Sequence, residues 1–171
     1  VNGAEHIELL ADQAATLGGH LQLLAAPDTL VALAPRLLRL PVPIVFDHFG
    51  RIAPSMAGRH DAHRLVCRLL EAGRTWVKLS GGYIVSEAGP PDYPDVAGLV
   101  ASYARIAPER LVWGSDWPHA SATAGHQPLP DDAHQMNLLA RWLEDADVLH
   151  QVLVDNPARL YGFETSVPSR S

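Results

Sequence analysis

The sequence predicts an α/β protein with about four parallel strands and helices packed outside the sheet. Three observations predict this fold class. Strand-like and helix-like segments alternate along the chain, the strand-like segments are short and mostly apolar, and polar residues directly follow several of them. Apolar strands that alternate with helices are typical of a parallel sheet covered on both faces.

The composition is that of a compact globular protein. Hydrophobic residues make up 47% and charged residues 19%, so neither disorder nor a fibrous repeat is expected. The net charge is −6 and the 13 basic residues form no cluster, which argues against a nucleic-acid partner. No apolar run reaches the roughly 20 residues of a membrane helix, and the first residues lack the pattern of a signal peptide. We therefore expect a cytoplasmic protein without a membrane partner.

The chain is predicted to begin with a helix of about 14 residues, ended by the glycine pair at 18–19. Its buried face is expected to carry four apolar residues at helical spacing: Ile7, Leu10, Ala14 and Leu17. Strands follow at 20–25 and 42–47. Residues 28–40 between them have helical periodicity, but Pro35 lacks a donor and predicts two short helical pieces.

The second half of the chain repeats the alternation. A helix over 61–72, a strand at 75–80, a helix over 95–107 and a strand at 110–115 are predicted in that order. The proline-rich segment 87–94, placed directly after a strand, is expected to be a loop.

The last part of the chain is predicted to be helical. Helices are expected over 131–145 and 148–154, followed by a final turn with Asn156 as N-cap and Gly162 as its stop. Residues 164–171 are expected to be a loose tail.

Four strands are half the number in an eight-stranded parallel barrel, which takes about 250 residues. We therefore expect residues 1–163 to form the carboxyl-terminal part of such a barrel. His20 and Gln22 share a parity on their strand, so they are expected either to point together into the barrel interior or to form a packed pair.

Polar residues stand at the ends of three predicted strands, where parallel barrels carry their catalytic groups. They are Asp47-His48, Ser80 and Ser115-Asp116. Asp116 could accept hydrogen bonds, hold a cation or act as a base, or it could simply cap a helix. His48 could polarise a carbonyl, transfer a proton or bind a metal, or it could be an ordinary hydrogen-bonded histidine.

Four further residues near these strand ends are candidates for substrate binding. Arg51 could hold a carboxylate through two hydrogen bonds, although a surface arginine is nearly as good an interpretation. His119 could donate a hydrogen bond to the substrate or orient Asp116, or it could be a structural histidine next to Pro118. Ser80 and Tyr83 could hydrogen-bond a substrate carbonyl or carboxylate, or belong to an ordinary glycine-containing turn.

Four segments of the chain form an ordered set of motifs: VFDHFGR, WVKLSGGY, RLVWGSDWPH and VDNPARLYGF. In order and spacing they resemble segments of 2-pyrone-4,6-dicarboxylate hydrolase and its relatives in the amidohydrolase superfamily. The resemblance implies part of a distorted (β/α)8 barrel that hydrolyses lactones or related carboxylic substrates, usually small and anionic, often in the breakdown of aromatic compounds. It also implies that His48 and Asp116 are catalytic, with Asp116 as the base for water.

The chain departs from the family at two points. The family's opening strand carries a His-x-His pair, which this chain lacks. Close relatives have an arginine that binds a carboxylate of the substrate at the position where this chain has Ile84. The second departure argues against the pyrone dicarboxylate itself as the substrate.

Three interpretations of function remain open from the sequence. In the leading one, Asp116 activates water to open a lactone of a small anionic substrate, without a metal or other cofactor. In the second, His48 and Asp116 bind a divalent metal such as zinc in a hydrolase or decarboxylase. In the third, the chain is a truncated, non-catalytic subunit. Exposed strand edges of a half barrel also predict self-association, as a homo-oligomer.

Overall fold

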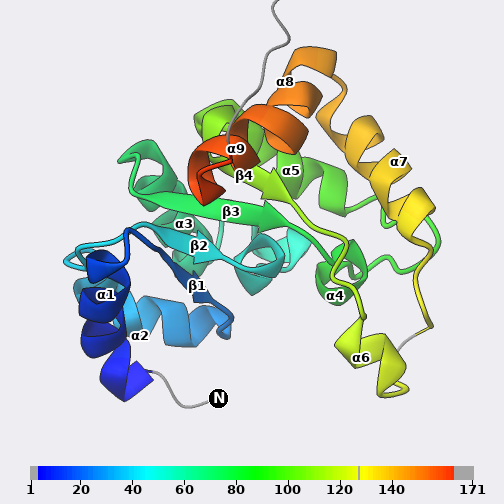
Figure 1. The fold of residues 1–171 in the computed structure, drawn as a ribbon. Helices are drawn as coiled ribbons and strands as arrows, with labels where there is room; N and C mark the ends of the chain where they lie inside the picture. Colours follow the sequence, from blue (N-terminus) through cyan, green and yellow to red (C-terminus); the bar gives the residue numbers. More distant parts are fainter. Residues whose placement is uncertain (1–3, 127, 164–171) are drawn as a thin grey trace, which may run out of the picture.

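The computed structural model describes residues 4–126 and 128–163, which form one parallel sheet with helices around it (Figure 1). The strand order is β1-β2-β3-β4, and each strand pairs in parallel with the next. The strands are β1 (Leu21–Leu23), β2 (Ile44–Phe46), β3 (Thr75–Leu79) and β4 (Leu111–Trp113). The predicted parallel strands are confirmed, each somewhat shorter than expected.

Helices fill the connections between the strands and follow the last one. Within the described ranges none is long and apolar enough to cross a membrane. The α-helices are α1 (Ile7–Thr16), α2 (Pro27–Leu37), α3 (Asp61–Glu71), α4 (Gly82–Val85), α5 (Val96–Ile106), α6 (Ala120–Thr123), α7 (Asp132–Leu143), α8 (Ala146–His150) and α9 (Asn156–Tyr161). The 3-10 turns are η1 (Ala4–His6), η2 (His48–Arg51), η3 (Pro54–Met56) and η4 (Pro108–Arg110), and η5 (Gln151–Asp155) is a π-helix.

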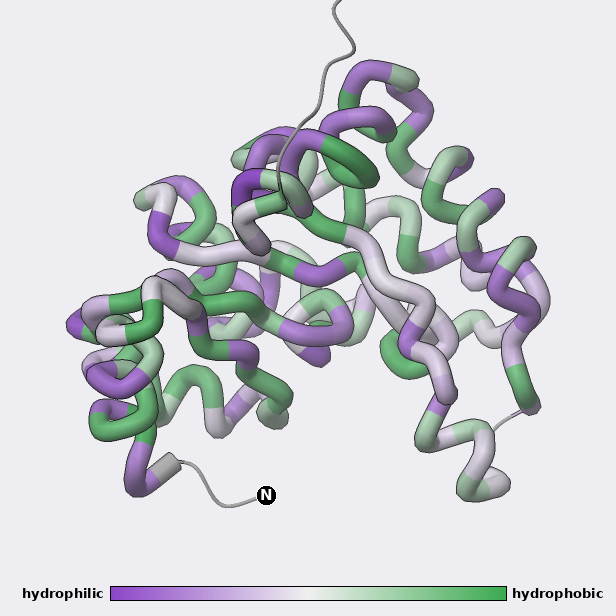
Figure 2. The backbone as a smooth tube through the Cα atoms, viewed as in Figure 1, coloured by the Kyte–Doolittle hydropathy of each residue, from purple (hydrophilic) through white to green (hydrophobic). Residues whose placement is uncertain are grey.

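The two faces of the sheet have different partners. One face belongs to the main core. It carries Phe46, Val77 and the other strand side chains that point the same way, and it packs against buried residues of α2, α3, α5 and α7. The opposite face carries a small apolar cluster of Val45, Trp76 and Val112, packed against Leu160 of α9. In Figure 1, α3 and α5 accordingly lie behind the sheet and α9 lies in front of it. The helices alternate between hydrophobic and hydrophilic residues along their lengths (Figure 2).

The first predicted helix is present as the 3-10 turn η1 followed directly by α1, but the prediction of its buried face is wrong in part. α1 has 10 residues, and its buried positions are Ile7 and Ala11. Leu10 is 43% exposed and Leu17 is 85% exposed. Residues at spacing i, i+4 lie one above the other on a helix, so Ala11 follows Ile7 on the same face. Leu17 lies beyond Thr16, where the helix ends.

The predicted break in the second helix is also wrong. α2 continues through Pro35, which lies in its last turn. A proline there removes one hydrogen bond near the helix end, whereas Leu30 and Leu37 bury almost their whole side chains in the core. Tertiary packing therefore outweighs the local preference of the proline.

The carboxyl-terminal helices follow the prediction except at Asn156. Asp131 caps α7 by accepting a hydrogen bond from the His134 backbone, and Gly162 ends α9 in a left-handed conformation with φ 72°. Asn156 is not an N-cap, because η5 runs into α9 without a break and Asn156 itself has helical angles. The predicted loose tail at 164–171 lies outside the described residues.

The segment 87–94 has no helix or strand, as predicted. It does not follow β3 directly, however, because α4 stands between them. The helix begins next to Gly81, whose φ of 62° is readily adopted by glycine. This tight turn carries the chain over the carboxyl end of β3 and places Tyr83 near the end of β4.

Candidate active site

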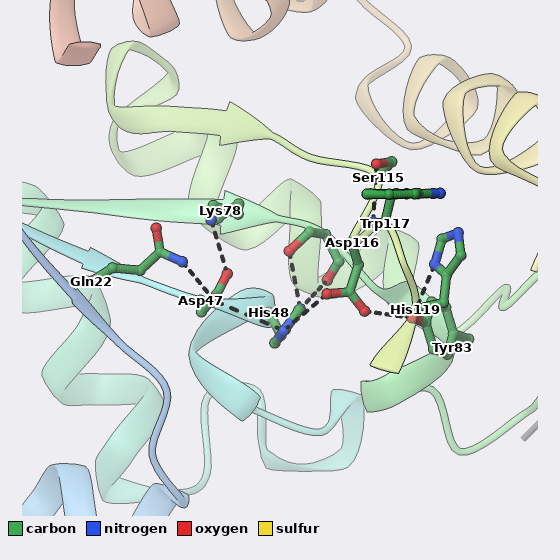
Figure 3. Close-up of polar contacts among 10 residues, drawn as sticks. Gln22, Asp47, His48, Lys78, Tyr83, Ser115, Asp116, Trp117 and His119 are labelled. Carbon is green, nitrogen blue, oxygen red and sulfur yellow. Dashed lines mark hydrogen bonds and ion pairs between the residues drawn. The ribbon is translucent and has the colours of Figure 1, made fainter. Parts of the chain in front are cut away.

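The polar residues that end β2, β3 and β4 meet at the carboxyl edge of the sheet (Figure 3). His48 Nδ1 lies 3.0 Å from Ser80 Oγ and 3.3 Å from the Ser80 carbonyl oxygen. On the other side of the ring, His48 Nε2 lies 3.5 Å from Asp116 Oδ1. The predicted convergence of His48, Ser80 and Asp116 is therefore present in the structure.

The contacts of His48 limit where its protons lie. A backbone carbonyl oxygen can only accept, so Nδ1 donates when it bonds the Ser80 carbonyl. Nε2 then faces two carboxylates, Asp116 and, at 3.8 Å, Asp47 Oδ2. The imidazole is buried, and its ring is oriented by Ser80 so that Nε2 can exchange a proton with groups beside Asp116.

The second oxygen of Asp116 is held from the other side by α4. Tyr83 donates a hydrogen bond of 2.5 Å from its hydroxyl to Asp116 Oδ2. The same hydroxyl lies 3.3 Å from His119 Nδ1, and His119 Nε2 lies 3.0 Å from Asp132 Oδ1. Burial, and then the hydrogen bond to Asp116, raise the pKa of the Tyr83 hydroxyl well above its ordinary value. Tyr83 therefore stays protonated and serves as a donor.

The loops that carry these residues hold strained backbone. Seven non-glycine residues of the described chain have positive φ, and five lie in the loops after β2 and β4: His48, Phe49, Arg51, Asp116 and His119. Such conformations cost about 1 to 3 kcal/mol each and tend to gather at functional sites. At Asp116, with φ 69°, this conformation points the carboxylate back across the end of the sheet.

A second polar layer, made of Gln22, Asp47 and Lys78, lies beneath these residues, and sequence reasoning missed Lys78. Lys78 Nζ lies 3.3 Å from Asp47 Oδ1 as an ion pair, although the angles do not make a good hydrogen bond. Gln22 donates to Asp47 Oδ2 at 2.8 Å, so it points inward as predicted. His20 instead contacts the ring of Tyr161 edge-on, and the two do not form a pair. The available signal was Lys78, a charge within an otherwise apolar strand.

A cavity of about 440 Å³ opens above these two layers. Its size is within the range of small-molecule sites. Its polar lining includes Gln22, Asp47, Lys78, Ser80, Ser115 and Asp116. A larger hollow of about 640 Å³ lies beside α2 and α3, away from the strand ends, and contains none of these residues.

Two predicted site residues differ in how the structure places them. His119 is buried and joins the network through Tyr83. Arg51 is exposed at the end of η2, and within the described ranges no hydrogen bond or ion pair links it to the cluster. Binding of substrate by Arg51 stays a prediction that requires the side chain to reach toward the cavity.

The described residues by themselves do not complete a metal site. Nowhere in residues 4–126 and 128–163 do three histidine, cysteine or acidic side chains gather as a ligand set. Asp116 and His48 would supply two ligands, and one oxygen of Asp116 is already bonded to Tyr83. A zinc ion normally takes at least three protein ligands.

Comparison with known proteins supports the resemblance seen in the sequence. The chain is 39% identical to 4-sulfomuconolactone hydrolase of Rhizobium radiobacter over 137 residues, 80% of this chain and 45% of the relative. It is 28% identical to 2-pyrone-4,6-dicarboxylate hydrolase of Comamonas testosteroni over 160 residues, 89% of this chain and 52% of the relative. A ligand-free crystal structure from Agrobacterium tumefaciens aligns with a TM-score of 0.82 and 30% identity, covering 94% of this chain and 57% of that one.

The chain thus spans about half the length of the curated relatives it matches. The structural match covers 94% of this chain, and the fold corresponds to part of a (β/α)8 barrel. A family model described as amidohydrolase matches residues 10–163, and the chain therefore belongs to the amidohydrolase family.

Proposed function

We propose that the protein containing this chain opens the lactone ring of a small anionic substrate by general-base attack of water. One observation carries the proposal: the carboxylate of Asp116 lies at the cavity wall, held between the imidazole of His48 and the hydroxyl of Tyr83. The names of the relatives support the substrate class, since they describe hydrolases of a sulfonated lactone and of a pyrone dicarboxylate.

The proposed reaction needs one base and one group that stabilises negative charge. Asp116 takes a proton from water as the water oxygen attacks the lactone carbonyl carbon, and the carbonyl oxygen becomes an oxyanion. A protonated His48 stabilises this charge from the adjacent position. The ring carbon–oxygen bond then breaks, and the leaving oxygen takes the proton from Asp116. The product is a hydroxy acid, and Asp116 returns to its starting state.

Substrate binding is proposed for the groups around this pair. Ser80 contacts His48 and Tyr83 contacts Asp116, which supports the proposal that these two hydroxyl groups help to orient the lactone carbonyl. His119 lies behind Tyr83, and Arg51 lies at the exposed end of η2. With its side chain extended toward the cavity, the Arg51 guanidinium would favour an anionic substrate, because it can bind a carboxylate or sulfonate through two hydrogen bonds.

Substitution of Asp116 by asparagine tests the proposal in the full-length protein. We expect turnover of lactone substrates to fall by roughly 10²- to 10⁴-fold, the usual scale for loss of a general base. The fold should survive, because asparagine tolerates the left-handed conformation that Asp116 adopts. Rates of lactone opening and the melting temperature are measured together.

The matched control is Asp131→Asn, which makes the same chemical change at a helix cap. Asp131 accepts a hydrogen bond from the His134 backbone, and asparagine caps helices about equally well. Turnover of this variant should equal that of the parent. Near-parental turnover in a folded Asp116→Asn protein would refute the base assignment. A parent protein that opens none of a panel of anionic lactones would instead favour the non-catalytic interpretation.

Metal dependence is tested separately by chelation. The proposed mechanism uses only protein groups, so lactone opening should persist at the same rate after dialysis against a chelator. Loss of activity that zinc or manganese restores would show that a bound metal supplies the activated water. Metal analysis of the protein before and after dialysis connects the rate to the metal content.

A further inference from the structure

The amino-terminal ends of the strands surround a second cavity, on the opposite edge of the sheet from the candidate active site. Its volume is about 410 Å³. His20, Pro43 and Arg110 line it, and each directly precedes a strand. Trp76 lines it too, and the four residue steps from Trp76 to Ser80 span about 13 Å along an extended strand. The two cavities therefore share no lining residue and lie at opposite ends of β3.

Two arginines of this cavity lie over one indole ring. The guanidinium carbons of Arg110 and Arg159 are 5.1 Å and 5.2 Å from the ring centre of Trp76. Trp76 is 2% exposed, so its ring gives both guanidinium groups a fixed platform. Stacking orients a guanidinium but leaves its in-plane donors available to a ligand.

The two arginines differ in how their donors are used. Arg159 donates to the Glu109 carbonyl oxygen and to Asn156 Oδ1. Arg110 Nε is buried and has no hydrogen-bond partner in the described part of the chain. Across those residues, neither guanidinium forms an ion pair with a carboxylate. A buried charged donor without a partner is costly, and arginine cannot lose its proton to relieve that cost.

The rest of the lining indicates what kind of anion fits. Pro41, Val42, Pro43 and Leu160 supply apolar surface. Burial, and then the charge of Lys78, lower the pKa of His20, so this ring is neutral near pH 7 and adds no further positive charge. The cavity thus offers one unpaired guanidinium beside apolar walls, which suits an anion with an apolar body better than a fully hydrated inorganic ion.

We propose that this cavity binds a small organic carboxylate, which pairs with the Nη donors of Arg110 and packs its apolar body against Leu160 and the prolines. The two Nη groups of a guanidinium form a planar fork that matches the two oxygens of a carboxylate. Arg159 adds favourable charge without a direct bond. The site is separate from the proposed lactone chemistry and does not depend on it.

Calorimetric titration of the full-length protein tests the site, with benzoate as the probe and benzyl alcohol as its neutral counterpart. We expect benzoate to bind and benzyl alcohol to bind at least about tenfold more weakly, because it lacks the charge-assisted pair. Arg110→Gln should weaken benzoate binding at least about tenfold. Arg110→Lys keeps the charge and the alkyl stem but loses the fork, so intermediate affinity is expected.

Two controls decide the outcome. Arg105→Gln removes an equal charge from an exposed position on α5 and should leave benzoate affinity unchanged. Asp116→Asn alters only the candidate active site and should also leave it unchanged. The proposal is overturned if benzoate and benzyl alcohol bind alike, if Arg110→Lys binds as well as the parent, or if Asp116→Asn changes the affinity as Arg110→Gln does. Inorganic phosphate that binds more tightly than benzoate would overturn the assignment to an organic carboxylate.

Discussion

Asp116 is the residue at which the contacts of the candidate site converge. One of its oxygens faces the His48 imidazole and the other accepts the hydroxyl proton of Tyr83. A base held on both sides loses little freedom when it acts, and positioning of this kind contributes strongly to catalysis. The Tyr83 hydroxyl is also the link to His119, so its loss would separate the base from the groups behind it.

Tyr83→Phe tests that link. We expect turnover of lactones to fall by roughly tenfold to a hundredfold, the scale of one hydrogen bond to a charged group, while the ring keeps its place in the core. The matched control is Tyr93→Phe, since Tyr93 is equally buried and its hydroxyl has no hydrogen bond to another described residue. Equal rates for the two variants would mean that the Tyr83 hydroxyl does not hold the base.

The sequence predicted His48, Ser80 and Asp116 but missed Lys78 and its contact with Asp47. His48, Ser80 and Asp116 could be found because each lies within three residues of the end of an apolar strand. The contact between Asp47 and Lys78 depends on strand register, which places these side chains on the same face of neighbouring strands. Sequence alone does not give that register. The exposed place of Arg51 depends likewise on the left-handed turn at η2.

Among the helices, tertiary contacts explain why two predictions from local sequence rules were wrong, at Pro35 and at Asn156. Pro35 is tolerated within α2 because buried leucines on the same helix hold it to the core. Asn156 was predicted to cap a helix, but its fully buried amide instead donates to the Pro108 and Leu111 carbonyl oxygens, at 2.8 Å and 2.7 Å. These bonds fasten the start of α9 to β4. Helix positions themselves were predictable because amphipathic periodicity is local.

Asn156→Ala should therefore destabilise the fold rather than change the chemistry. The carbonyl oxygens of Pro108 and Leu111 lose their hydrogen-bond donor. This lowers the free energy of unfolding by about 1 to 3 kcal/mol for each group left unsatisfied. For a protein of this size, each kcal/mol lowers the melting temperature by roughly 2 to 4 °C. Asn137→Ala is the matched control, because Asn137 is exposed on α7. A melting temperature equal to that of the control would contradict the anchoring role.

At the scale of the molecule, the sheet separates two kinds of surface. The face toward α3 and α5 is covered by the main core, whereas the opposite face carries the polar layers, the small Trp76 cluster and α9 (Figure 1). Within the described residues, β1 and β4 each pair on one side only. The strand count, the parallel order and the family were predictable from alternation and motifs. The crossing of α9 over the open face was not, because it depends on Leu160 meeting residues far away in the sequence.

The 171-residue chain, expressed by itself, is expected to self-associate. The described residues leave the outer edges of β1 and β4 without a neighbouring strand, and unpaired edges are templates for pairing with another chain. Apolar side chains near β1 add to this tendency, since Leu17 is 85% exposed and Leu24 is 58% exposed. Light scattering at micromolar concentration should give a mass above that of one chain. Leu24→Lys should lower that mass, because a lysine beside an edge strand opposes pairing. A parent chain that stays monomeric and melts cooperatively at the same concentration would show that these edges do not drive association.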